Sequence, residues 1–315
     1  MATEIPGAVE SGPSEFTQTL HDVTTDKSIA LLGNMHATIQ GKFERCREAL
    51  LVSDPDLDRE ALISAKGKRA PGTCEWIVED PHYKSWLARE FPILQISGRP
   101  GTGKTMLSLF LTEKLAERCG QENEQLLFFY CRFQDERFNN RQNVLRNIIC
   151  QLLEFSKPDC QQVKDVLRDF ESPKKTNDIL SSFEALWGIV KKLLSQPGLP
   201  TIWCIIDGMD ECQSFEKLQG ELYDYCRACG QQDGESKLQL LILGRQNDDY
   251  NASHVIKLDE DHQNRIKNDV ECFIISGLEP LERIPEFAQI RDDVTRMLFE
   301  KAEGTFLWSN RFPRG

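Results

Sequence analysis

The sequence has no apolar run that approaches the roughly 20 residues needed to cross a bilayer, so we expect no membrane-spanning helix. It also has no basic excess, because 50 acidic residues outnumber 38 lysines and arginines and leave a net charge of −12. No cluster of Lys and Arg stands out from this acidic background, which argues against broad nucleic-acid binding. The N-terminus carries Glu4 and Glu10 and lacks an apolar signal segment.

A cysteine framework is missing as well. The 11 cysteines are scattered and odd in number. Cys226 and Cys229 have no second C-x-x-C or H-x₃₋₅-H pair that would complete a structural zinc site. Cys150 and Cys204 lie in apolar runs, as small core residues do. We therefore expect a cytoplasmic protein with reduced cysteines. The 40% hydrophobic and 28% charged residues are an ordinary balance for a globular chain of 315 residues.

What the sequence does contain is a glycine-rich loop between a predicted strand at residues 93–97 and a predicted helix at residues 106–119. The loop fits the phosphate-binding pattern G-x-x-x-x-G-K-[ST] and consists of Gly98, Arg99, Pro100, Gly101, Thr102, Gly103, Lys104 and Thr105. Its backbone N–H groups and the start of the helix would point at one anion. We expect Lys104 to reach the β- and γ-phosphates of a nucleotide and the Thr105 hydroxyl to bind Mg²⁺.

A second motif supports this prediction. Residues 200–207 form an apolar, β-branched run that ends in Asp207, typical of a strand buried on both faces of a parallel sheet. Asp207 would emerge at the carboxyl end of its strand, where open α/β sheets bind ligands. A carboxylate there can hold Mg²⁺ directly or through water. Together the two motifs predict a nucleotide site with Mg²⁺ at Thr105 and Asp207.

The order of the predicted elements indicates an α/β fold. Further strands are predicted at residues 126–133, 237–243 and 254–258, and helices at residues 144–155 and 183–194. Strands that alternate with helices imply a mostly parallel sheet with helices on both faces. With the two motifs above, this is the expected architecture of a P-loop NTPase, preceded by a short helical N-terminal segment.

Three regions are predicted along the chain. Residues 1–28 are polar and aperiodic and are expected to form a flexible arm. Residues 29–71 are expected to form an amphipathic helix and then a linker with one helical turn, and residues 72–315 the P-loop NTPase domain. The apolar face of the helix runs from Leu32 to Leu50. This face either packs on the chain's own domain, which we favour, or binds a protein partner.

Several segments between residues 72 and 308 occur in the order typical of one protein family. They are residues 72–77, 83–87, the glycine-rich loop, residues 128–131, 207–211, 244–245 and 304–308. Together they resemble the NACHT-type NTPases, signal-transducing proteins of the STAND class, in the fungal NLR-like branch related to the nephrocystin N-terminal domain. The resemblance implies a domain that changes state with its bound nucleotide.

The resemblance also implies roles for three further residues. Many related ATPases place a glutamate directly after the metal-binding aspartate, but here that position is Gly208. The carboxylate that orients the attacking water would then be Asp210 or Glu211, and we prefer Glu211. Arg245 stands where the family has its sensor arginine and could contact the γ-phosphate.

We therefore predict a nucleotide-dependent molecular switch that binds a nucleoside triphosphate with Mg²⁺ and hydrolyses it slowly, in signalling or in an assembly of the innate-immunity or incompatibility type. ATP is preferred to GTP because the sequence has no N-K-x-D motif that would read guanine. Two alternatives stay open. One is a small-molecule kinase with residues 135–141 as its lid, and the other is a non-catalytic interaction protein that holds nucleotide.

The family normally continues into a winged-helix region and repeats, whereas this chain ends at Gly315. We therefore expect either a minimal nucleotide-binding module or a shortened form of a longer protein. Besides nucleotide, its expected partner is another protein or a second copy of itself.

Overall fold

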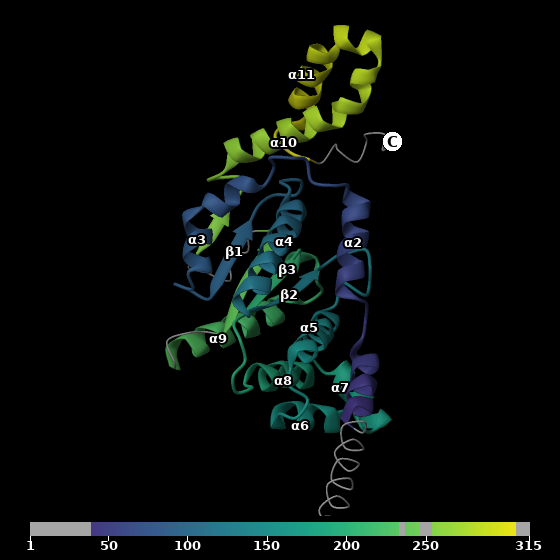
Figure 1. Ribbon diagram of the computed structural model, residues 1–315, viewed down its shortest axis with the longest axis vertical. Coiled ribbons are helices and arrows are strands. Elements are labelled where there is room, and N and C mark those ends of the chain that lie inside the picture. The colour runs from purple at the N-terminus through teal and green to yellow at the C-terminus, as the bar shows by residue number, and fades with distance from the viewer. Residues whose placement is uncertain (1–38, 233–236, 246–253, 307–315) are drawn as a thin grey trace, which may run out of the picture.

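A computed structural model describes residues 39–232, 237–245 and 254–306 (Figure 1). The described strands are β1 (Ile93–Ser97), β2 (Gln125–Tyr130), β3 (Ile202–Asp207), β4 (Leu238–Gly244) and β5 (Val255–Lys257). The labelled α-helices are α2 (Pro55–Lys66), α3 (Pro81–Leu87), α4 (Lys104–Glu122), α5 (Arg141–Phe155), α6 (Gln161–Asp169), α7 (Pro173–Ser181), α8 (Phe183–Leu194), α9 (Phe215–Gln232), α10 (Gln263–Leu278) and α11 (Arg291–Ala302). The 3₁₀ helices are η1 (Glu75–Glu79), η2 (Met209–Glu211), η3 (Glu279–Arg283) and η4 (Pro285–Gln289).

The described strands form one parallel sheet in the order β2-β3-β4-β1-β5. Every residue of β1, β3 and β4 is buried, which explains why these strands are almost continuously apolar instead of alternating. The predicted α/β fold with a parallel sheet is confirmed. Because all strands run the same way, their carboxyl ends share one edge, where β1 leads into the glycine-rich loop and β3 ends at Asp207.

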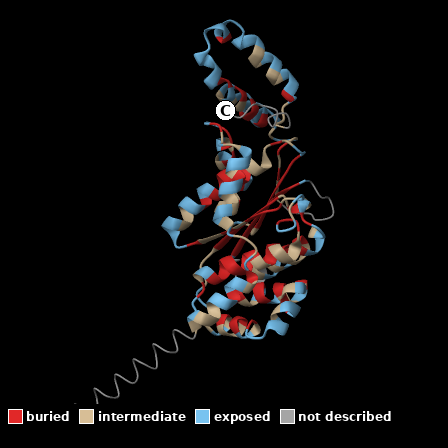
Figure 2. Cartoon of the chain, turned by 90° about the vertical axis from the view of Figure 1, so that its right-hand side faces the viewer, coloured by how far each residue is buried: buried red, intermediate tan, exposed pale blue. Residues whose placement is uncertain are grey.

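Helices cover both faces of this sheet, as predicted (Figure 1). Trp203 and Ile205 of β3 pack with α3, α4 and α10 on one face. Cys204 and Ile206 pack with α5, α8 and α9 on the other face. Successive residues of a strand point to opposite faces, so one strand contributes to two cores. Figure 2 shows the result, with the strands as a buried band between helices whose outer sides are exposed.

Residues 39–50 are helical and belong to the second of these cores. Cys46 and Leu50 are fully buried, and the Nε of Arg146 on α5 donates a hydrogen bond to the Leu50 carbonyl at 3.2 Å. The apolar face of residues 39–50 therefore packs on the chain's own domain, and the partner-binding alternative is wrong for these residues. The earlier part of the predicted stripe and the arm predicted at residues 1–28 lie outside the described residues.

Two predicted boundaries are wrong. The segment predicted as a linker with one helical turn contains α2, a helix of 12 residues. The Asp54 carboxylate accepts two backbone N–H groups at its start, and Pro55 occupies its first turn, which are ordinary helix-starting signals. The second strand ends at Tyr130 and not at residue 133. Its partner β3 ends at Asp207, directly opposite Tyr130, so no strand remains to pair with the following residues.

The C-terminal helices α10 and α11 pack against each other at the top of Figure 1. Ile266, Val270 and Ile274 of α10 are buried and join this helix pair to the first core. Ile266 also lines a cavity beside the sheet edge, together with Asp269 and Phe273 of the same helix. Across the described part of the chain, no helix is both long and apolar enough to cross a membrane.

Candidate nucleotide-binding site

The glycine-rich loop joins β1 to α4, and its shape depends on glycine. Gly101 and Gly103 have φ angles of 83° and 89°, which residues with a side chain rarely adopt. A Cβ at Gly98 would lie only 2.8 Å from Thr102 Oγ1. Thr102 closes the loop, because its N–H and its hydroxyl both donate to the Arg99 carbonyl, at 3.3 Å and 2.9 Å.

Lys104 lies over this loop at the start of α4. Its Nζ donates to the carbonyl oxygens of Gly98 at 2.6 Å and Arg99 at 3.0 Å. Burial lowers the pKa of its ammonium, although the nearby carboxylates of Asp210 and Asp207 oppose that shift. The first turn of α4 contains no acidic residue, so its own side chains do not neutralise the partial positive charge of the helix N-terminus. The loop, the helix start and Lys104 therefore gather positive charge at one point.

Asp207 faces this point from the carboxyl end of β3. The residue is only 3% exposed, and it lines the same cavity as Thr105. Burial raises the pKa of its carboxyl from 3.8 to about 7. The charges of Glu211 and Asp210 add to the rise, while Thr105 and Lys104 oppose it only in part. The charge of Lys104 therefore offsets the buried charge of Asp207 only in part, and a cation beside Asp207 would stabilise its ionised form.

The chain turns sharply after Asp207. Gly208 has a φ angle of 67°, and a Cβ there would lie 3.1 Å from the Cys131 carbonyl oxygen. A larger residue would strain the backbone and press on that carbonyl. The lack of a glutamate at position 208 thus has a local structural cause, and the following acids lie on η2 instead.

Asp210, Glu211 and Arg245 all line the same cavity as the loop, yet each already has a partner. Asp210 Oδ1 accepts the Arg245 backbone N–H at 3.0 Å, and Asp210 Oδ2 lies 3.1 Å from Arg245 Nε. Glu211 Oε2 accepts the Phe133 N–H at 3.0 Å. Arg245 is therefore held by Asp210, whereas Glu211 Oε1 accepts no hydrogen bond from the described residues.

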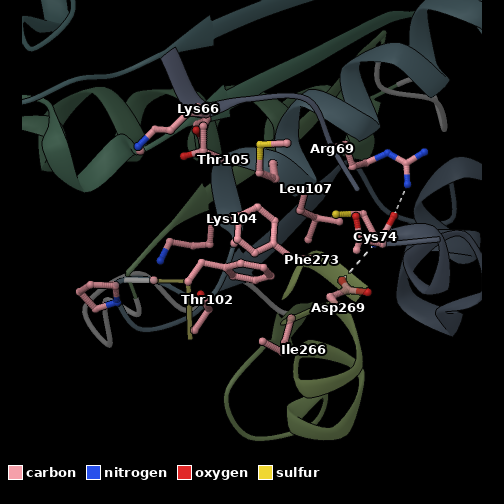
Figure 3. Close-up of a pocket in the computed structure, with 18 of the residues that line it drawn as sticks. Lys66, Arg69, Cys74, Thr102, Lys104, Thr105, Leu107, Ile266, Asp269 and Phe273 are labelled. Atoms are coloured by element: carbon pink, nitrogen blue, oxygen red, sulfur yellow. Dashed lines mark hydrogen bonds between the residues drawn. The ribbon is translucent and has the colours of Figure 1, made fainter. Parts of the chain in front are cut away.

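The glycine-rich loop, Asp207 and these three residues line one cavity of about 280 Å³. Figure 3 shows Thr102, Lys104 and Thr105 of the loop at its wall. A second group of lining residues was not assigned to the site from sequence. It comprises Cys74 and Trp76 before β1, and Ile266, Asp269 and Phe273 on α10. The only sequence signal for Cys74 and Trp76 was the family-like segment at residues 72–77. No sequence pattern indicated that α10 lines this cavity. Its Asp269 contacts Cys74, which lies 195 positions earlier in the chain, and only the fold brings the two together.

Three basic residues from the end of α2 and the following turn add positive charge to the cavity. They are Lys66, Lys68 and Arg69, and Arg69 is fixed by a hydrogen bond to the Thr73 carbonyl and by a position 4.8 Å from the centre of the Phe110 ring. In total five basic residues line the cavity against four acidic ones. In a chain with a net charge of −12, this local reversal favours an anionic ligand.

The C-terminal closing segment also reaches the loop. The Phe306 N–H donates to the Gly101 carbonyl at 2.7 Å. Its ring lies so close to Gly103 that a Cβ there would be 3.0 Å away. Phe273 meets Phe306 edge to face, with ring centroids 5.6 Å apart. The described part of the family-like segment at residues 304–308 therefore packs directly on the glycine-rich loop.

Comparison with known proteins gives three findings. The family model described as nephrocystin 3, N-terminal, matches residues 72–245. The vegetative incompatibility protein HET-E-1 of Podospora anserina is 32% identical over 174 residues, which are 55% of this chain and 12% of that protein. The ORC2 protein of Aeropyrum pernix, solved as ADPNP–ADP complexes, shares 15% identity over 63% of this chain and 50% of that chain, with a TM-score of 0.35.

The structural match is too low to indicate a shared overall fold, and the chain spans only 12% of the length of the curated relative. The family match, in contrast, covers more than half of the chain and includes the glycine-rich loop, Asp207 and Arg245. It confirms the predicted resemblance to the nephrocystin-like branch of NACHT-type proteins. The chain belongs to the nephrocystin 3 N-terminal family.

Proposed function

We propose that this chain is a nucleotide-binding module that holds a nucleoside triphosphate with Mg²⁺, hydrolyses it slowly and acts as a molecular switch in signalling. We propose ATP over GTP because the sequence has no guanine-reading N-K-x-D motif. The observation that carries the proposal is the meeting of Lys104, Thr105 and Asp207 in a single cavity. These residues come from segments far apart in the chain.

The glycine-rich loop suits a phosphate group. Gly101 and Gly103 let backbone amides approach an anion without an intervening Cβ. The present acceptors of Lys104 Nζ are neutral carbonyl oxygens, and a charged phosphate oxygen would be a stronger acceptor. Lys104 would therefore exchange loop carbonyls for the β- and γ-phosphates.

The donor set at Asp207 suits Mg²⁺. This ion is usually held by one or two carboxylates together with phosphate oxygens and waters. Among the described residues, no group of three His, Cys, Asp or Glu side chains could hold a metal by itself. Asp207 and the Thr105 hydroxyl would hold the ion together with oxygens of the nucleotide. When bound, Mg²⁺ would neutralise negative charge on the β- and γ-phosphates.

Hydrolysis also needs a group that orients water. We assign this role to Glu211, because its Oε1 is free of hydrogen bonds from the described residues while both oxygens of Asp210 contact Arg245. Arg245 would contact the γ-phosphate only after leaving the Asp210 carboxylate. Because Arg245 must first break its ion pair with Asp210 before it can stabilise the γ-phosphate, we expect hydrolysis to be slow.

The signalling role is supported by the similarity to a protein named for vegetative incompatibility. We propose that this chain, in the cytoplasm, passes its nucleotide state to a protein partner or a second copy of itself. In this proposal residues 72–315 form the NTPase domain, and residues 29–71 form its N-terminal extension.

One observation favours a second candidate, a non-catalytic protein that keeps nucleotide bound. Gly208 stands at the position where many related ATPases have the catalytic glutamate. Asp210, the first acidic residue after it, is paired with Arg245. The kinase alternative has no such support. The loop suggested as its lid leads into α5, where the Asn140 side chain accepts the Gln142 N–H at 2.8 Å and caps the helix.

Mass spectrometry of nucleotide released from the purified chain, with a turnover assay on the same sample, tests these functions. The switch predicts bound nucleotide and slow, Mg²⁺-dependent phosphate release that Glu211→Ala abolishes. Bound nucleotide without release would favour the non-catalytic protein, and transfer to an added sugar or nucleoside would favour the kinase. A chain that neither carries nor binds added nucleotide would contradict the proposal.

A further inference from the structure

The second part of the cavity differs in chemistry from the glycine-rich loop. Ile266 and Phe273 of α10 make it apolar, and Asp269 of the same helix places one carboxylate in it. Asp269 is only 6% exposed. Figure 3 shows its carboxylate hydrogen-bonded to Cys74, on the segment that precedes β1. This part of the cavity therefore combines apolar walls with a single buried acidic acceptor.

The two oxygens of Asp269 are not equivalent. Oδ2 accepts the Cys74 backbone N–H at 3.0 Å and the Trp76 Nε1–H at 3.1 Å. No described residue donates a hydrogen bond to Oδ1, and the residue lines the cavity. Burial raises the pKa of this carboxyl, although the hydrogen bonds from Cys74 and Trp76 and the charge of Arg69 oppose the rise. In this largely buried residue, Oδ1 is thus an acceptor without a donor among the described residues.

The chemistry of such a group restricts its ligand. An ionised carboxylate only accepts hydrogen bonds, so the ligand atom beside Oδ1 must carry a hydrogen. A carbonyl oxygen or a bare ring nitrogen in that place would be repelled. The apolar side chains of Ile266 and Phe273 suit a flat heteroaromatic ring. A nucleobase with an exocyclic amine meets both requirements.

We propose that Asp269 is a specificity-determining residue that accepts a hydrogen bond from the exocyclic amine of the nucleobase and so selects amine-bearing nucleotides. The inference rests on the proposed function, because the loop would hold the phosphates of the same molecule. It goes further by assigning base selection to α10, a helix outside the family-matched residues 72–245.

A purely structural role for Asp269 makes a different prediction. In that case the residue only ties α10 to the segment at Cys74 and Trp76, and nucleotides that differ by one amine would bind equally. The variant Asp269→Asn separates the two roles, because it keeps the size of the side chain and an acceptor for those two donors while adding an amide donor of its own. Asp261→Asn, an exposed change just before α10, is the matched control.

The test measures competition of four unlabelled triphosphates against one fluorescent nucleotide, with Mg²⁺, on the full chain. ATP is compared with purine riboside triphosphate, which lacks the 6-amine, and GTP with inosine triphosphate, which lacks the 2-amine. In the wild type and in Asp261→Asn, we expect the amine-bearing member of at least one pair to bind about tenfold more tightly. In Asp269→Asn this preference should shrink to about twofold or less.

Equal affinity within both pairs in the wild type would overturn the inference while leaving nucleotide binding intact, and this result does not depend on any variant folding. A preference that Asp269→Asn leaves unchanged would also overturn it, because another group would then read the base. Failure of all four triphosphates to bind would instead contradict the proposed function itself.

Discussion

The ionised carboxylate of Asp207 is predicted to lower the free energy of unfolding of the chain, because burial disfavours its charge. Its carboxyl has a pKa of about 7 in the folded chain against 3.8 as the ordinary value. The folded state therefore holds the proton more tightly than the unfolded state does. Stability from this group is fully present below pH 4 and is lost progressively as the pH rises through 7.

The size of the effect follows from the two pKa values. Each pKa unit is worth about 1.4 kcal/mol, so the difference of about 3 units costs about 4 kcal/mol once the pH exceeds 7. At pH 5 the unfolded carboxyl is already ionised but the folded one is not, and the cost is about 2 kcal/mol. Asp207→Asn removes the charge while keeping a side chain of nearly the same size with one acceptor oxygen.

Urea unfolding of the ligand-free chain in EDTA measures this directly. We expect Asp207→Asn to gain stability relative to the wild type as the pH rises from 5 to 8, by about 2 kcal/mol. The same variant should lose the extra stability that the wild type gains from Mg²⁺ and nucleotide. Asp261→Asn, an exposed change, should show neither effect. A stability difference between Asp207→Asn and wild type that stays constant over this pH range would refute the reasoning.

Three other predictions concern Glu211, Gly103 and Glu124. Glu211→Ala should keep nucleotide affinity and lose phosphate release in a turnover assay; if Asp210→Ala alone does so, the base is Asp210. Gly103→Ala should lower the free energy of unfolding by about 1–2 kcal/mol, because residue 103 has a φ of 89° and its Cβ would approach Phe306 at 3.0 Å; unchanged urea unfolding would count against the contact. Glu124→Gln should cost about 2 kcal/mol in thermal unfolding, because the buried Glu124 carboxylate accepts Trp203 Nε1–H at 2.7 Å and pairs with two partly exposed arginines. An unchanged melting temperature would show that this ion cluster adds nothing.

The shape of the glycine-rich loop and the buried strand that ends at Asp207 could be predicted because their signals are local. The loop's glycines are needed for its own backbone angles, and the apolar run before Asp207 is what a strand buried on both faces requires. The helix α2 was missed although Asp54 and Pro55 are local start signals, because the charged composition around it suggested a linker. Composition was the weaker guide there.

Pairings that depend on the fold could not be predicted. The contact of Arg245 with Asp210 spans 35 positions and exists only because β3 and β4 are neighbours in the sheet. Asp269 lies on a helix whose sequence gives no hint that one carboxylate faces a cavity. Phe306 reaches Gly101 only because α10 and α11 bring the C-terminal segment back over the loop. These long-range contacts supply the part of the cavity away from the glycine-rich loop.

The most direct test is a calorimetric titration of ATP with Mg²⁺ into the wild type, Lys104→Ala and Lys114→Ala. Lys114 is a matched control, because it lies on the same helix and its ammonium pairs with Glu117 at 2.9 Å, outside the cavity. A phosphate site at the glycine-rich loop predicts equal affinity for wild type and Lys114→Ala, and a loss of at least about tenfold for Lys104→Ala. Unchanged affinity in Lys104→Ala would contradict a nucleotide site at this loop.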